Sequence, residues 1–350
     1  MELNKRLAAF EKLGIFLTEH NSKQYQTLLP EHEIFEKLIV QVKIHNPWFT
    51  ENNVWIALKG IAGSLEHHNL QTWIKPYTEL LSGTEAGKRV LVIMAGNIPM
   101  VGFQDFLHVL VSGNHFVGKV SSDDHLLIPF LAALLLQFEP EFKDRIEFSD
   151  GRVKEMDAVI ATGSTNSSRY FDYYFGKYPH IIRKNRHSIA ILNGSEEAGD
   201  FHSLGNDIFL YYGLGCRNVS KLFVPGGYRF DSFFEGIFNH SYVLESNKYT
   251  NNYEYNKTIY LLNSEKLLDN NFLLLREDKS LSSPIGVLFY EYYKDKQALK
   301  LRLQEDASEI QCVVSKAGSY PGSLSFGKSQ FPMPWDYADG IDTLKFLAGL

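Results

Sequence analysis

The stretch VLVIMAGNIP, residues 90–99, decides the fold that we predict for this 350-residue chain. Its first six residues form a continuous apolar run of strand length, which is typical of a parallel strand covered on both faces. A GNIP turn follows, and the apolar segment after it predicts a helix that ends at the SGN sequence of residues 112–114. A strand, a turn and a helix in this order predict the first half of a βαβ unit.

The same alternation continues along the chain. Further strands are predicted at residues 115–120, 145–148 and 157–161, with helices at 123–138 and from about 167. After a strand at 189–192 the alternation restarts, with strands near 222–224, 272–275, 287–290 and 312–314. Strands and helices at this spacing predict an α/β fold built from two doubly wound, mainly parallel sheets.

The composition is that of a soluble globular protein. Hydrophobic residues make up 44% and charged residues 22%, and 41 acidic against 35 basic residues give a net charge of −6, which argues against a nucleic-acid partner. The longest apolar run, residues 126–136, is too short to span a bilayer, and the amino terminus has no secretory pattern. We therefore expect a cytoplasmic protein without a membrane span. Two widely separated cysteines and scattered histidines predict neither a disulfide framework nor a metal site.

The sequence GLGCRN, residues 213–218, sets Cys216 on a glycine-flanked turn between a predicted helix at 207–212 and a predicted strand from Ser220. An exposed thiol in such a turn is a candidate nucleophile. The alternative is a small buried side chain, which is the commoner fate of a single cysteine. Cys312 lies in a strand-like run, and this position favours a buried, structural role for it.

Two polar residues follow predicted strands. Asn97 lies at the carboxyl end of the 90–95 strand, where its amide would stabilise an oxyanion; otherwise it is a turn residue that tolerates left-handed backbone. Lys119 ends an apolar strand, so it either pairs with a cofactor phosphate or hydroxyl, or reaches solvent.

The TGST sequence follows the 157–161 strand and opens a helix. Its amides and hydroxyls would bind a phosphate, or its side chains cap the helix. It consists of Thr162, Gly163, Ser164 and Thr165. A basic run, RKNRH at residues 183–187, either contacts anionic phosphates or forms a solvated face. No GxGxxG or P-loop sequence is present, so a dinucleotide would bind in another way.

Together these motifs resemble the aldehyde dehydrogenase superfamily, and most closely its long-chain acyl-CoA reductase branch, known from bacterial bioluminescence fatty acid reduction. The resemblance spans about residues 90–346 and includes the CRNVS sequence at 216–220 and the DYADGID sequence at 336–342. It implies an aldehyde dehydrogenase-like fold, with the active site between two doubly wound units. It makes Cys216 the nucleophile and places Asn97 in the oxyanion hole.

The resemblance also implies cofactor contacts. Lys119 would hold the adenine ribose, with Ser121 and Ser122 beside it, and the TGST loop would cover the pyrophosphate. Where enzymes selective for NAD place a carboxylate near the ribose, this chain has Ser122. Such a carboxylate repels the 2′-phosphate of NADPH. Because Ser122 carries no charge, we expect NADPH to be accepted at least as well as NADH. Asp123 and Asp124 follow, and we expect them to cap the next helix.

One departure from the superfamily concerns hydrolysis. Ile191, in ILNG at 191–194, stands where hydrolytic members have the glutamate that activates water. Another is the SSP sequence at 282–284, in place of a segment whose glutamate contacts the nicotinamide ribose. We therefore expect an NAD(P)H-dependent reductase that converts a fatty acyl-CoA or acyl-protein thioester to the aldehyde. The alternatives are a hydrolytic aldehyde dehydrogenase and a cysteine acyltransferase or acyl-carrier component without reductase activity.

On this interpretation the chain has four regions. Residues 1–88 form a helical region that packs on the cofactor domain, 89–188 the dinucleotide-binding domain, 189–326 the catalytic domain, and 327–350 a segment that packs back across the domains. A homo-oligomer or an acyltransferase partner is compatible with the resemblance.

Overall fold

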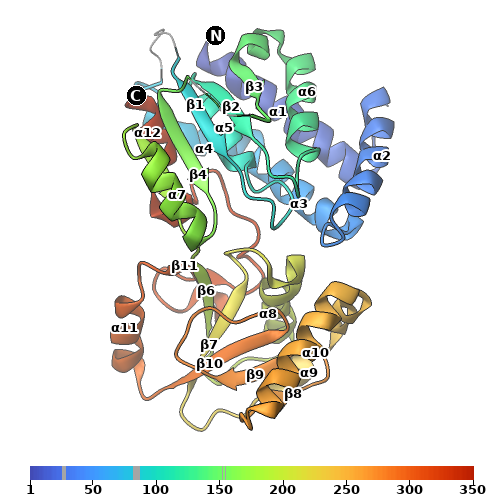
Figure 1. The fold of residues 1–350 in the computed structure, drawn as a ribbon, viewed down its shortest axis with the longest axis vertical. Helices are drawn as coiled ribbons and strands as arrows, with labels where there is room; N and C mark the ends of the chain where they lie inside the picture. The colour runs from blue at the N-terminus through green and yellow to red at the C-terminus, as the bar shows by residue number, and fades with distance from the viewer. Residues whose placement is uncertain (26–28, 82–86, 152, 154) are drawn as a thin grey trace. The chain divides into compact units, whose positions relative to one another are not determined.

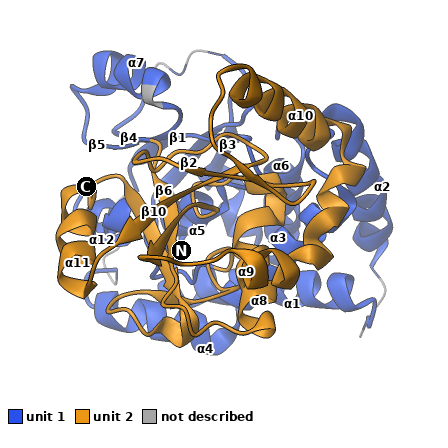
Figure 2. Ribbon diagram, turned by 90° about the horizontal axis from the view of Figure 1, so that it is seen from below, with its two compact units in different colours: residues 1–184, 332–350 blue, residues 185–331 orange. Residues whose placement is uncertain are grey.

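The computed structural model describes residues 1–25, 29–81, 87–151, 153 and 155–350, with the main chain but not the side chain of Thr165. The chain divides into two compact units (Figure 2). Unit 1 comprises Met1–Lys184 and Pro332–Leu350, and unit 2 comprises Asn185–Phe331. Both contain a predominantly parallel sheet, so the predicted α/β class with doubly wound sheets is confirmed.

Unit 1 is built on five parallel strands in the order β3-β2-β1-β4-β5. The strands are β1 (Arg89–Ile93), β2 (His115–Lys119), β3 (Ile146–Phe148), β4 (Ala158–Thr162) and β5 (His180–Arg183). The helices between them are α5 (Phe103–Val111), α6 (Leu127–Phe138) and α7 (Thr165–Phe175), with a short 3-10 helix η2 (Pro140–Arg145). The order reverses at β1, because β2 lies on one side of it and β4 on the other.

Strand β1 is covered on both faces, as its apolar run predicts. Val90 and Val92 belong to the main core that α1, α5 and α6 build, whereas Leu91 belongs to a second cluster completed by Phe171 and Phe175 of α7. Because successive side chains of a strand point to opposite faces, only an uninterrupted apolar sequence satisfies both layers.

Before the sheet, unit 1 is helical. The helices are α1 (Leu3–Ser22), α2 (Pro30–His45), α3 (Glu51–Ser64), α4 (His67–Ile74) and the 3-10 helix η1 (Lys75–Tyr77). Helix α1 packs on α3, α5 and α6, and it buries Phe10, Leu13 and Leu17 completely.

The chain end returns to unit 1 with η6 (Ala338–Gly340) and α12 (Thr343–Ala348), seen in red among the blue and green elements of that unit (Figure 1). Tyr337 accepts a hydrogen bond from the Trp73 indole at 2.9 Å, and Tyr77 donates to Asp342 at 2.7 Å. These bonds give a structural reason for the DYADGID sequence.

Unit 2 has seven strands in the order β12-β11-β6-β7-β10-β9-β8, and only the β8–β9 pair is antiparallel. The strands are β6 (His187–Ile191), β7 (Val219–Pro225), β8 (Leu268–Asp269), β9 (Leu274–Glu277), β10 (Val287–Tyr293), β11 (Ile310–Ser315) and β12 (Leu324–Ser325). The helices are α8 (Ala198–Phe209), α9 (Asp231–Gly236), α10 (Asn247–Leu262) and α11 (Lys296–Glu305), with the 3-10 helices η3 (Leu210–Gly213), η4 (Phe238–Glu245) and η5 (Lys316–Gly318).

Candidate active site

Cys216 lies on the turn between α8 and β7, and its side chain is exposed. The helix predicted over 207–212 is wrong in its second half, because α8 ends at Phe209. Tyr211 and Tyr212 then adopt positive φ angles of 53° and 57°, and Gly213 follows at 78°. Three consecutive left-handed residues cannot continue a right-handed helix, so the chain reverses sharply before the cysteine.

Several side chains of unit 2 hold this turn. The Asn218 amide group donates to carbonyls at the end of α8, and its oxygen accepts from the Gly215 amide at 2.8 Å. Ser188, which is completely buried on β6, donates from its hydroxyl to the Cys216 carbonyl at 3.0 Å. The main chain on both sides of the thiol is thus fixed by buried groups.

Arg217 ties the same turn to a segment distant in sequence. Its Nε donates to the Ser329 carbonyl at 2.5 Å. The completely buried Asp207 of α8 accepts from the Ser329 amide and hydroxyl and from the Gly327 amide. Burial raises the pKa of Asp207, and these bonds and the nearby Arg217 charge oppose the rise. The nucleophile turn, α8 and residues 327–329 therefore form one polar network.

Cys312 has a different environment. It is half-buried on β11, and its Sγ lies 3.0 Å from the Ser188 Oγ. The same hydroxyl contacts the Cys216 carbonyl, so Ser188 stands between the second cysteine and the main chain of the first. This packing agrees with a structural role for Cys312.

In unit 1, Asn97 is exposed on the bend that follows β1. The bend is held at Met100, whose φ is 59° and whose amide donates to Asp124 at 2.6 Å. Asp124 is 7% exposed, and burial raises its pKa to about 6. A buried carboxylate therefore fixes the turn that presents Asn97.

The Asp124 contact corrects the expected helix start. Helix α6 begins at Leu127 and not at Asp123, because Ser121 and Asp124 pair across a tight turn. Neither aspartate is the N-cap residue, which is Leu126, although the first amide of the helix, that of Leu127, interacts with the Asp124 carboxylate and opposes the rise in its pKa. The Asp123 amide instead donates to the Ser121 hydroxyl at 3.2 Å.

Three predicted cofactor residues lie together at the end of β2. The Lys119 and Ser122 side chains are exposed, whereas Ser121 is half-buried. Lys119 is paired in register with Ile93 of β1. A side chain added at Gly96 would meet the Ser121 hydroxyl at 2.6 Å, so the turns after β1 and β2 lie against each other.

The TGST loop follows β4. Ser164 is the N-cap of α7, and its hydroxyl accepts from the Ser167 amide at 3.2 Å, so the capping alternative holds for this side chain. A side chain at Gly163 would approach Ser167 and Phe171 within about 3.0 Å, so glycine lets α7 pack closely on the strand. Thr162 ends β4 and is half-buried, while the Thr165 side chain lies outside the described part of the chain.

These positions belong to one edge of the unit 1 sheet. The strands are parallel, so Asn97, Lys119 and Thr162 all lie at carboxyl ends, around the point where the strand order reverses. Ligands of open α/β sheets bind at such switch points. The arrangement can receive a dinucleotide along the ends of β2, β1 and β4.

The first residue of the basic run, Arg183, has a structural role in unit 1. Arg183 is 7% exposed and forms a bidentate pair with Asp105, at 2.5 and 2.8 Å, so for this residue neither a phosphate contact nor a solvated face holds. It also donates to Thr343 at 3.2 Å, which joins α5, β5 and α12. His187 begins β6.

The loop after β6 contains a carboxylate that the sequence analysis overlooked. Ile191 is 6% exposed at the end of the strand. Glu196 accepts from the Asn193 and Gly194 amides at 2.7 and 3.0 Å. Its two oxygens close this loop, which argues against a role as the missing water-activating base.

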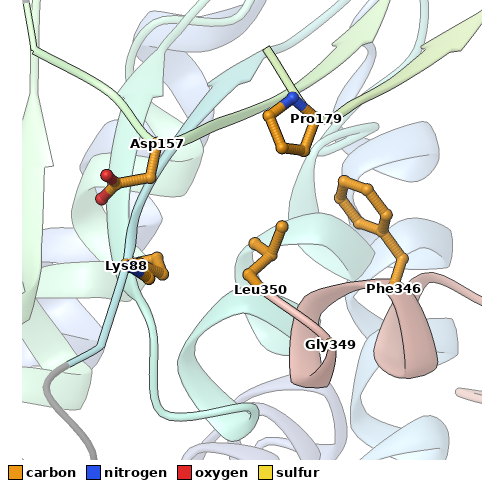
Figure 3. A pocket seen from close by; sticks show the side chains of 6 residues that line it. All are labelled: Lys88, Asp157, Pro179, Phe346, Gly349 and Leu350. Atoms are coloured by element: carbon orange, nitrogen blue, oxygen red, sulfur yellow. The ribbon is translucent and has the colours of Figure 1, made fainter.

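A cavity of about 380 Å³ lies elsewhere in unit 1 (Figure 3). Its lining residues are Lys88, Asp157, Pro179, Phe346, Gly349 and Leu350. The first three immediately precede β1, β4 and β5, so the cavity is at the amino ends of the strands. This is the opposite end of the sheet from the candidate cofactor residues, and we do not assign the cavity to the chemistry.

Sequence reasoning missed Ser188 and Asp207, the contact of Asp124 with the Met100 turn and the role of Asn218. No local pattern marks them, because each acts through a main-chain group that only folding brings near. Among the described residues, no group of three or more His, Cys, Asp or Glu is placed to hold a metal ion. Within the same ranges, no helix combines the length and apolar character needed to cross a bilayer.

Known structures that share this fold include aldehyde dehydrogenases. Aldehyde dehydrogenase 21 from Physcomitrella patens, solved with succinate, matches with a TM-score of 0.68 and 14% identity over 100% of this chain and 84% of that one. A Mycobacterium tuberculosis aldehyde dehydrogenase complexed with NAD+ matches with a TM-score of 0.63 and 14% identity, over 94% and 76%. An indole-3-acetaldehyde dehydrogenase of P. syringae has a TM-score of 0.63 and 12% identity, over 92% and 74%. At this identity they show the fold alone.

A family model, and not an individual relative, identifies the family of this chain. A comparison with curated proteins gives no match. The family model described as acyl-CoA reductase (LuxC) matches residues 1–235 of the 350, which include the Cys216 turn and the candidate cofactor residues. The resemblance inferred from the motifs is thereby confirmed, and this chain belongs to the acyl-CoA reductase (LuxC) family, whose members are oxidoreductases that act on acyl groups.

Proposed function

We propose that this protein reduces a long-chain acyl thioester to the fatty aldehyde through an acyl-enzyme on Cys216, with NADPH as the preferred hydride donor. The observation that carries the proposal is the Cys216 turn. An exposed thiol stands on a main chain that buried Ser188 and Asn218 hold from both sides. Fixed geometry of this kind favours a nucleophile, since it reduces the entropy lost on reaching the transition state.

The thiolate of Cys216 adds to the thioester carbonyl to give a tetrahedral oxyanion, and collapse of this oxyanion breaks the carbon–sulfur bond to CoA. CoA leaves as a thiolate, so the acyl transfer needs no external oxidant or reductant. After hydride addition, the hemithioacetal on Cys216 collapses to the aldehyde and the thiolate is regenerated. The Asn97 amide is proposed to donate to the developing oxyanion.

The residues at the carboxyl edge of the unit 1 sheet fit a nicotinamide dinucleotide. Lys119 and Ser122 are exposed there, and the amino end of the 11-residue helix α7 offers its positive dipole end to a diphosphate. A nicotinamide dinucleotide held there would supply the hydride. The preference for NADPH is proposed from Ser122, because no carboxylate at that position would repel a 2′-phosphate. The NAD+ complexes of structural neighbours support a nicotinamide cofactor.

A hydrolytic aldehyde dehydrogenase is less well supported, because apolar Ile191 ends β6 and the Glu196 oxygens are bound to loop amides. An acyl carrier without reductase activity is the other alternative. The decisive experiment is a single turnover of wild type and Cys216→Ala with acyl-CoA of graded chain length. CoA release, NADPH oxidation and intact mass are followed together, with Cys312→Ala as the matched control.

We expect wild type and Cys312→Ala to form a mass adduct and to consume NADPH, and Cys216→Ala to do neither. An acyl adduct that persists on Cys216→Ala would refute the assignment. An adduct on wild type without dinucleotide binding by calorimetry would identify a carrier, and aldehyde oxidation to the free acid without CoA would identify a hydrolytic enzyme.

A further inference from the structure

The side chain of Asn218 connects the nucleophile turn to the end of α8. Its Nδ2 lies 3.1 Å from the Asp207 carbonyl, 3.3 Å from that of Ile208 and 2.8 Å from that of Leu210. Its Oδ1 accepts from the Gly215 amide at 2.8 Å. The residue is 3% exposed, so these bonds replace water completely.

The network fixes the orientation of the amide. Three carbonyls require the nitrogen on one side, and an amide N–H requires the oxygen on the other. Two hydrogens serve three carbonyls, so at least one is shared. Carbonyls at a helix end lack intrahelical partners, and Asn218 therefore acts as a cap that reaches back from the far side of the turn.

The segment that Asn218 spans is strained. Tyr211 and Tyr212 both have left-handed backbone, which costs on the order of 1–3 kcal/mol for each such residue unless the surroundings enforce it. The Leu214 amide donates to the Tyr211 carbonyl at 3.1 Å, and the Asn218 amide donates to the Gly215 carbonyl at 3.0 Å. The Asn218 side chain bridges these two turns, with Cys216 inside the second.

We propose that Asn218 is the positioning residue of the nucleophile: its side chain holds the strained 211–213 segment against α8 and so sets the reactivity of the Cys216 thiol. The functional part of this inference rests on the proposed role of Cys216. Asn218 itself takes no proton and contacts no substrate in this scheme. Its loss lets the turn relax, and a displacement of about 1 Å at a reacting atom can cost about a hundredfold in rate.

The test uses Asn218→Ala and Asn218→Asp in a Cys312→Ala background, where Cys216 is the only thiol. Asn218→Asp retains an acceptor for the Gly215 amide but places a carboxylate against three carbonyls. Iodoacetamide alkylation is followed by intact mass from about pH 6 to pH 10, beside the kcat and KM for acyl-CoA reduction. The control is Asn256→Ala, since the Asn256 side chain also donates to two carbonyls, at 2.9 and 3.0 Å, but on α10.

We expect both Asn218 variants to lower two rates by about tenfold to a hundredfold: the alkylation rate constant on its plateau at high pH, and kcat. KM should change little. Asn218→Asp should also move the alkylation profile to higher pH, because a nearby negative charge disfavours the thiolate. Asn256→Ala should match the parent protein in each measurement.

Alkylation profiles and kcat values equal to those of Asn256→Ala would overturn the inference, and so would failure of both Asn218 variants to fold, since Asn218 would then determine the fold and not the reactivity. If the parent protein forms no acyl adduct, the proposed function fails, while the alkylation comparison still tests Asn218.

Discussion

Replacing Asp124 by asparagine should remove one contribution to the pH dependence of unit 1 stability, the one that falls as the pH rises. Asp124 is 7% exposed, and burial raises its pKa from 3.8 to about 6. Between these values the folded state binds more protons than the unfolded state, so stability is greatest at low pH and falls as the pH rises through 6. Full ionisation of Asp124 in the folded state therefore costs about 3 kcal/mol, the free energy that corresponds to this rise in its pKa.

The Asp124→Asn side chain cannot ionise, yet its oxygen can still accept from the Met100 amide. Relative to this variant, wild type should therefore lose about 2 kcal/mol in free energy of unfolding between pH 4.5 and pH 8. Urea unfolding followed by tryptophan fluorescence measures it directly, because all four tryptophans belong to unit 1: Trp48, Trp55, Trp73 and Trp335.

The matched control is Asp123→Asn, which removes an exposed carboxylate one residue away. Its difference from wild type should be the same at both pH values. If Asp124→Asn shows an equally constant difference, the buried carboxylate does not carry the charge cost, and the reasoning is refuted.

Four further outcomes are expected. Cys312→Ala should keep most reductase activity, because Ser188 still donates to the Cys216 carbonyl; a dead but folded variant would contradict this. Asn97→Ala should lower kcat by about two to three orders of magnitude if it removes an oxyanion donor, whereas a loss below about threefold would leave only a turn role. Ser122→Glu should shift the ratio of kcat/KM toward NADH; an unchanged strong preference for NADH would show that residue 122 does not face the ribose. Burial lowers the pKa of His20, the buried histidine of α1, to about 4. Protonation of His20 therefore favours the unfolded state, and its contribution to the stability of the folded state is lost as the pH falls below about 6.5. Melting temperatures at pH 5 and pH 7 should therefore differ less in His20→Gln than in wild type, and an equal difference would refute this assignment.

Local sequence determined the scaffold of this protein. The VLVIMA run could satisfy two apolar layers only as a central parallel strand, and the spacing of later strands predicted two α/β units. The GLGCRN turn identified Cys216 for the same reason, since glycines and polar residues interrupt an apolar pattern where the backbone must reverse. Such signals survive in sequence because burial and turn geometry depend mainly on each residue and its neighbours.

The tertiary structure decided which polar groups meet. Arg183 looked like part of a basic surface until folding paired it with Asp105, 78 residues away. Asp124 was expected only at the start of a helix, yet its carboxylate also accepts from the Met100 amide, on the turn that follows another strand. A buried donor or acceptor must find a partner, but any of many distant groups can serve. The periodicity of the sequence does not indicate which distant group becomes the partner. The contacts that position Asn97 and Cys216 therefore became visible only in the folded chain.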